Sequence, residues 1–130
     1  MVLRPLSRFF CSYSAFRGNL CTIAVAMNIK IYQDENGNNP YLRWLKKLKD
    51  RQAQLKIEKR LAQLRLGHLG DFKNLGSGLL ELRIHFGPGY RIYCAKQGQM
   101  LIILLCAGDK STQQRDIDKA RKYWEDYQNG

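Results

Sequence analysis

Residues 81–94, ELRIHFGPGYRIYC, alternate between apolar and polar side chains on both sides of Gly87-Pro88-Gly89. A period of two is typical of a β-strand with one buried face, and the Gly-Pro-Gly interruption favours a turn. The stretch therefore predicts a β-hairpin. If these three residues form the whole connection, Phe86 lies opposite Tyr90, and this pairing sets the register of both strands.

This register brings basic and aromatic side chains together on one face of the hairpin. His85 lies opposite Arg91, and Arg83 lies opposite Tyr93, while the other face is apolar. Directly opposed side chains have Cβ atoms about 4.5–5.5 Å apart. Glu81 follows on the same face, where it can orient Arg83 through a contact along the strand. The hairpin thus predicts a patch of two guanidinium groups, an imidazole and a phenol.

Two interpretations of this patch stay open. Arg and His are ordinary residues of a solvated sheet face, and a phosphate-binding site accounts for their spacing equally well. Cleavage of RNA by its own 2′-hydroxyl requires a proton acceptor, a proton donor and positive charge near the phosphate. His85 can transfer the proton, because imidazole titrates near neutral pH. Arg83, Arg91 and Lys110 supply the charge, so no metal or other cofactor is needed, and Tyr93 can stack on a base or donate a hydrogen bond.

Three further lysines add to the basic character of the chain. Lys56 and Lys59 lie in a predicted helix, and Lys73 precedes the strands of the hairpin, so all three can contact an RNA backbone. A solvated helix face explains them more simply. The two histidines of the chain have no matching cluster of carboxylates or cysteines, and the sequence therefore predicts no metal site.

The first 26 residues differ in composition from the rest of the chain. They contain three arginines, no acidic residue and no hydrophobic period. An interrupted apolar segment argues against a secretory signal, whereas a transit peptide and an upstream extension both fit. We favour an extension, with the folded domain in residues 27–130. Without the three arginines, 19 Lys and Arg remain against 11 Asp and Glu, a charge of +8. This sign favours nucleic acid, an anionic membrane surface or an acidic protein as the partner, and no segment is long and apolar enough to span a bilayer.

From Met27 onward, the pattern predicts an α+β domain. A strand in MNIKIY is followed by two amphipathic helices that begin at Pro40 and after Asp50. Three antiparallel strands follow in residues 79–86, 90–96 and 100–107, and the last is apolar on both faces, so we expect it inside the sheet. A capping box that starts at Ser111 opens a final helix. This helix buries one apolar stripe: Ile117, Ala120, Trp124 and Tyr127.

Two long motifs carry a resemblance to a known family. GDFKNLGSGLLELRIHFGPGYRIYC (residues 70–94) and MLIILLCAGDKSTQQRDIDKA (residues 100–120) resemble the RelE/ParE superfamily of bacterial toxins. More narrowly, they are similar to the phage-derived addiction module killer proteins related to HigB, and the resemblance covers residues 27–129. It implies two helices packed on an antiparallel sheet and a cognate antitoxin, which we expect to be a small helix-turn-helix protein encoded beside the toxin. It also implies a cytoplasmic endoribonuclease that cuts mRNA in the ribosomal A site.

The resemblance assigns roles to four basic residues. Arg83 and His85 match positions where the family places basic residues. Arg91 matches the family's arginine after Gly-Tyr, and Lys110 matches a basic residue after the last strand.

One position departs from the family pattern. The family's nuclease tyrosine in the terminal helix falls at Ile117, so that role is vacant unless Tyr93 fills it. This departure leaves the assignment of acid and base open. It also keeps two alternatives, a ParE-like inhibitor of DNA gyrase and a nucleic-acid-binding module without catalysis.

Overall fold

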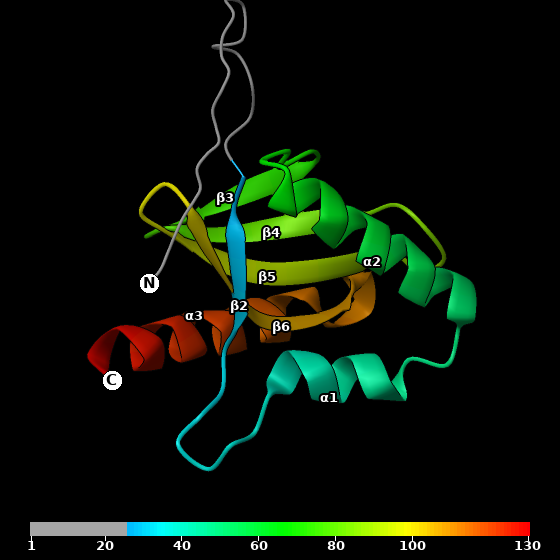
Figure 1. The fold of residues 1–130 in the computed structure, drawn as a ribbon. Helices are drawn as coiled ribbons and strands as arrows, with labels where there is room; N and C mark the ends of the chain where they lie inside the picture. Colours follow the sequence, from blue (N-terminus) through cyan, green and yellow to red (C-terminus); the bar gives the residue numbers. More distant parts are fainter. Residues whose placement is uncertain (1–25) are drawn as a thin grey trace, which may run out of the picture.

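The computed structural model describes residues 26–130, in which five strands form one mixed sheet (Figure 1). In chain order the strands are β2 (Asn28–Ile31), β3 (Phe72–Gly76), β4 (Leu79–Ile84), β5 (Tyr90–Gln97) and β6 (Leu101–Asp109). Their order across the sheet is β2-β6-β5-β4-β3, with β2 parallel to β6 and the other neighbours antiparallel. The α+β class and the interior position of the apolar strand β6 are confirmed, whereas β3 was not predicted.

The predictions for the beginning of the chain fall on a segment that is largely outside this description. Residues 1–25 lie outside the described residues, so the division of the chain at Met27 stays a prediction. None of the helices in the described part of the chain has the length and hydropathy that crossing a bilayer requires.

In residues 26–130, three α-helices cover the sheet, α1 (Pro40–Lys47) and α2 (Arg51–Arg65) on one face and α3 (Gln113–Asn129) on the other. Pro40 opens α1 as predicted, and the carboxylate of Asp50 caps α2 by accepting hydrogen bonds from two backbone N–H groups of its first turn. The predicted capping box at Ser111 is wrong. Asp109 accepts the hydrogen bond from the Ser111 N–H, a 3₁₀ turn, η3 (Lys110–Thr112), follows, and α3 begins after it.

Most of both faces of β4, β5 and β6 is buried, whereas the sequence predicted one apolar and one polar face for the hairpin. On one face, side chains of α1 and α2 pack against the even-numbered residues of β4, such as Leu82. On the other, Ile117, Ala120 and Trp124 of α3 pack over β4, β5 and β6, while Tyr127 is only partly buried. The amphipathic helix α3 therefore turns most of the second face into core.

The register of the hairpin differs from the predicted one by two residues. Arg83 pairs with Arg91, not with Tyr93, and Ile84 pairs with Tyr90. Side chains alternate between faces with a period of two, so a shift of two residues leaves each of them on its predicted face. Arg83 and Arg91 consequently do share a face, as the sequence indicated.

The shift arises in the connection between β4 and β5. The chain leaves the ladder after Ile84, so the connection comprises residues 85–89. It turns where the N–H of Gly89 donates to the carbonyl of Phe86 at 3.0 Å. Gly87 and Gly89 have φ angles of 58° and 86°, a region that side chains with a Cβ rarely adopt. His85 therefore lies in the loop and has no cross-strand partner in β5, which corrects its predicted pairing with Arg91.

Candidate functional site

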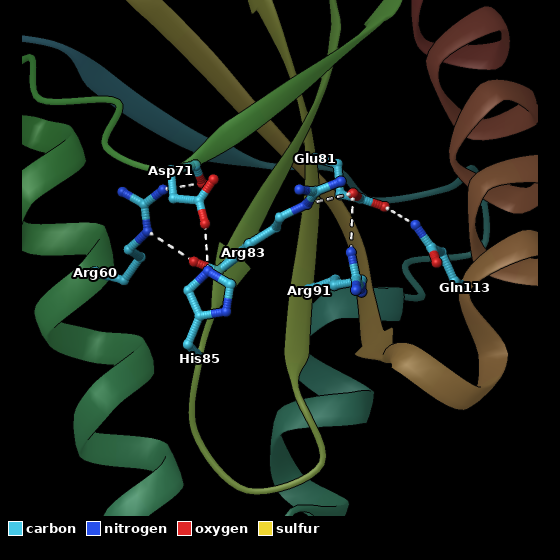
Figure 2. A network of polar contacts seen from close by, with 7 residues as sticks. All are labelled: Arg60, Asp71, Glu81, Arg83, His85, Arg91 and Gln113. Carbon is cyan, nitrogen blue, oxygen red and sulfur yellow. Dashed lines mark hydrogen bonds and ion pairs between the residues drawn. The ribbon is translucent and has the colours of Figure 1, made fainter.

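A buried carboxylate organises the basic residues of the hairpin. Glu81 of β4 is fully buried, and one of its oxygens accepts hydrogen bonds from Arg83 Nε and Arg91 Nη1, at 3.1 Å each (Figure 2). Its other oxygen accepts from Nε2 of Gln113, the first residue of α3, at 2.9 Å. The predicted contact between Glu81 and Arg83 is confirmed. Its links to Arg91 and Gln113 were not foreseen, because they depend on the true register and on the position of α3.

The electrostatics of this cluster keep Glu81 ionised. Burial by itself raises the pKa of Glu81, but the hydrogen bonds from Gln113 and Arg83 and the charges of Arg91 and Arg83 outweigh it, so the pKa lies below its ordinary value. Two guanidinium groups against one carboxylate leave one net positive charge. The side chain of Arg83 is 33% exposed and that of Arg91 13% exposed. The pair can therefore reach an anion at the surface of the domain.

His85 pairs with a carboxylate that the sequence did not reveal. Its imidazole Nε2 contacts Oδ2 of Asp71, on the β3 side of β4 (Figure 2). The hydrogen bond to His85 holds the pKa of Asp71 below its ordinary value, and the charges of His85, Arg83 and Arg60 act in the same direction. The contact with Asp71 orients the imidazole. Because the side chain of His85 is 76% exposed, the ring is also open to a ligand. Such a pair is suited to proton transfer.

Arg60 holds the backbone of Asp71 from the α2 side of the sheet. It comes from α2, is almost fully buried, and its guanidinium donates to the carbonyls of Asp71 at 2.7 Å and Arg83 at 3.4 Å. The N–H of Arg83 also donates to the Asp71 carbonyl, at 3.0 Å. A Cβ on Gly70, which has a φ of 62°, would lie 2.6 Å from the Arg60 guanidinium, so a larger residue here would strain the backbone and displace Arg60 from its two carbonyls. One signal was available: Arg60 lies three residues after Ile57, on the apolar stripe of α2.

Tyr93 does not lie at the surface, contrary to the prediction that it stacks on a base. Its side chain is fully buried beneath α3, and its hydroxyl lies near Glu81 but makes no hydrogen bond of ordinary geometry within the described residues. Burial, followed by the negative charge of Glu81, raises the pKa of Tyr93 far above its ordinary value. The phenol is therefore neutral and inaccessible. This difference follows from the packing of α3, which covers the face on which Tyr93 was correctly placed.

The predicted lysines fall at different distances from the cluster. Lys110 is exposed at the start of η3 and lies beside the hairpin turn, where a Cβ on Gly89 would be 3.8 Å from its own Cβ. Lys73 is exposed on the edge strand β3, where its backbone lies opposite that of Glu81 in β4. Lys56 and Lys59 project from α2, on the other side of the sheet. Lys56 approaches the ring of Phe86, with its Nζ 5.8 Å from the ring centroid.

The arrangement offers anion binding and proton transfer from neighbouring groups of one sheet face and its loop. Arg83 and Arg91 present fixed positive charge, and the pair of His85 and Asp71 lies beside Arg83. In residues 26–130, no group of three or more His, Cys, Asp or Glu side chains is arranged to hold a metal ion. The chemistry that these residues can support is therefore acid–base chemistry on an anionic substrate.

Comparisons with known proteins place the site inside a described family. The family model "Phage derived protein Gp49-like (DUF891)" matches residues 43–125, which contain all seven residues drawn in Figure 2. A protein of Haemophilus influenzae, named only as uncharacterized, is 50% identical over 78 residues. This similarity covers 60% of the chain and 79% of the relative.

Proposed function

Because the chain belongs to the Gp49-like family of phage-derived proteins, a RelE-like toxin family, we propose that it is the toxin of a type II toxin–antitoxin module. In this proposal it is a metal-independent endoribonuclease that cuts mRNA on the ribosome, in the cytoplasm, and a small helix-turn-helix antitoxin restrains it. The narrower kinship with HigB-related addiction module killer proteins is part of the same proposal. It is supported by the hairpin and last-strand motifs.

The observation that supports this reaction most directly is the arginine pair on Glu81. Attack of a 2′-hydroxyl on the adjacent phosphate concentrates negative charge on a phosphorane, which fixed guanidinium groups stabilise. Arg83 and Arg91 are direct cross-strand partners held by one buried carboxylate. Lys110, beside the hairpin turn, adds positive charge near the same end of the sheet.

His85 is the residue to which we assign proton transfer. Its contact with Asp71 holds the imidazole in one orientation, as expected of a group that donates a proton to the leaving 5′-oxygen. The proposal therefore makes His85 the general acid. The base that removes the 2′-hydroxyl proton has no assigned residue.

The chain offers a matched pair of variants for this test, because it contains two histidines. Brief induction of the full chain should halt growth and create new 5′ ends in mRNA. His85→Gln should slow cleavage by about 10²-fold or more, while His68→Gln, at an exposed position after α2, should cleave like the wild type. The measurement is mapping of RNA ends after a short pulse. Halted growth with intact transcripts would contradict the proposal.

A gyrase-directed toxin is the second candidate, and the lack of an accessible phenol at either candidate position favours it. Tyr93 is buried, and the position of the family's nuclease tyrosine holds Ile117, which is buried as well. A non-enzymatic inhibitor of DNA gyrase needs no such group. It predicts blocked supercoiling by purified gyrase and an induced DNA-damage response, with mRNA intact. A module that only binds nucleic acid predicts instead that His85→Gln changes nothing, while loss of Arg91 weakens binding in a salt-dependent way.

A further inference from the structure

A second basic feature lies outside the arginine cluster. Side chains of α1 and α3 line a groove of about 390 Å³ at the end of β6, whose floor is formed by residues 106–109. Arg43 and Lys47 project into it from α1, and Arg115 and Lys119 from α3. Each pair is four residues apart, so its members lie about 6 Å apart along their helix. The groove therefore has a row of two cations on each wall.

None of these four cations is held in an ion pair within the described part of the chain, although the charge of Arg43 contributes to lowering the pKa of Asp34. All four are exposed, and within residues 26–130 none of them forms an ion pair or a side-chain hydrogen bond. The two carboxylates of the groove are engaged elsewhere. Asp109 accepts hydrogen bonds from the N–H and the hydroxyl of Ser111, and Asp116 accepts one from the Thr112 hydroxyl. Four positive charges against two negative ones leave the groove with a surplus of two.

The floor and walls of the groove fit a peptide better than a nucleic acid. A phosphodiester chain carries a charge on every residue and would bring phosphates against Asp109 and Asp116, whereas an amphipathic peptide can set its carboxylates against the cationic walls and its uncharged parts near these two carboxylates. Each of the two aromatic rings in the walls already contacts another ring of the domain. Tyr123 stacks on Tyr32 with ring centroids 5.1 Å apart, and Trp44 meets Tyr90 edge-on with centroids 5.9 Å apart. Apolar side chains can pack against such rings.

We propose that this groove binds an amphipathic segment with acidic side chains from a protein partner. On the proposed function, on which this identification of the partner rests, the partner is the antitoxin. Carboxylates four residues apart on a helix repeat at the spacing of the cations on each wall, so one helical segment places two carboxylates against a row. Its apolar side chains face Trp44 and Tyr123.

The test is direct binding to the purified full chain, followed by fluorescence anisotropy. The probe is a labelled 18-residue helix of Leu, Ala and Glu, with its Glu residues four apart, in about 0.15 M salt. Arg43→Glu with Lys47→Glu should weaken binding at least about tenfold. Lys46→Glu with Lys49→Glu is the matched control, because it changes the net charge equally at exposed positions that do not line the groove. The control should bind within about twofold of the wild type.

Two further arms make the outcome decisive. A peptide with Lys in place of Glu should gain affinity for the Arg43→Glu, Lys47→Glu variant, which also shows that the variant is folded. A 12-nucleotide single-stranded RNA should bind both double variants alike. Equal peptide binding by both variants would overturn the proposal, and so would a loss confined to RNA. The assay involves neither cells nor ribosomes, so binding without mRNA cleavage would refute the proposed nuclease and leave the peptide groove standing.

Discussion

Replacement of Glu81 by alanine is expected to be among the most damaging single changes in the described part of the chain. It removes three hydrogen bonds at once, two of them from guanidinium groups, and leaves Arg83 and Arg91 facing each other across the strands. Loss of one partner of a buried ion pair costs about 3–5 kcal/mol. Since Arg83 and Arg91 remain 33% and 13% exposed and regain some hydration, the lower end, about 3 kcal/mol, is the expected loss.

Urea unfolding followed by tryptophan fluorescence measures this loss, because Trp44 and Trp124 report on α1 and α3. With a denaturant dependence of about 2 kcal/mol per molar urea, the midpoint should fall by about 1.5 M. Gln113→Ala, which removes one neutral donor, should cost about 1 kcal/mol. Glu35→Ala, at an exposed position, is the control and should stay within about 0.5 kcal/mol of the wild type.

The same experiment can separate an ionic anchor from a merely well-packed side chain. If Glu81 stabilises by pairing with charge, then replacing Glu81, Arg83 and Arg91 together with leucine should recover most of the stability lost in Glu81→Ala, because no buried charge is left unpaired. A Glu81→Ala variant within about 0.5 kcal/mol of the wild type would refute the reasoning. It would show that the two arginines are held by something other than this carboxylate.

Three further measurements test the charge of Glu81 and the packing around β5 and β6. The pKa of Glu81 is lowered in the folded chain, so the stabilisation by the Glu81 carboxylate is complete above the ordinary pKa of 4.5 and is lost as the pH falls through the lowered pKa. Urea midpoints below pH 4.5 should therefore drop more steeply for the wild type than for Glu81→Ala. Tyr93→Phe removes a buried hydroxyl that lies near Glu81 but makes no well-formed hydrogen bond within residues 26–130, so it should be neutral or stabilising by up to about 1 kcal/mol; a loss above about 1 kcal/mol would show that the hydroxyl does donate to Glu81. Gly108→Ala should destabilise by about 2 kcal/mol or more, since its Cβ would lie 1.9 Å from Asp116 Oδ2, and an unchanged melting temperature would disprove this packing.

The sequence predicted which side chains share a face of the hairpin better than it predicted which residues are cross-strand partners. Alternation places Arg83 and Arg91 on the same face for every loop length that shifts the register by an even number of residues. The pairing itself depends on where the chain leaves the ladder. It does so at Ile84, not at Phe86, because the turn takes in His85 and Phe86 as well as the glycines.

The residues that sequence reasoning missed are those fixed by tertiary contacts. β3 has only two apolar residues in FKNLG, so it gave no strand pattern, and Asp71 just before it had no visible partner. The burial of Tyr93 could not be inferred from β5, since it depends on the packing of α3. Arg60 alone had a local signal, a charged residue on the apolar stripe of α2.

The carboxylate of Glu81 also affects how much conformational entropy the domain loses when it binds an anion. A free arginine must give up rotational freedom when it binds, a cost of about 0.5–1.5 kcal/mol for each long side chain that becomes immobile. Arg83 and Arg91 have already lost that freedom during folding. This conformational entropy is lost on folding and not on binding, so an incoming anion meets donors that need no rearrangement.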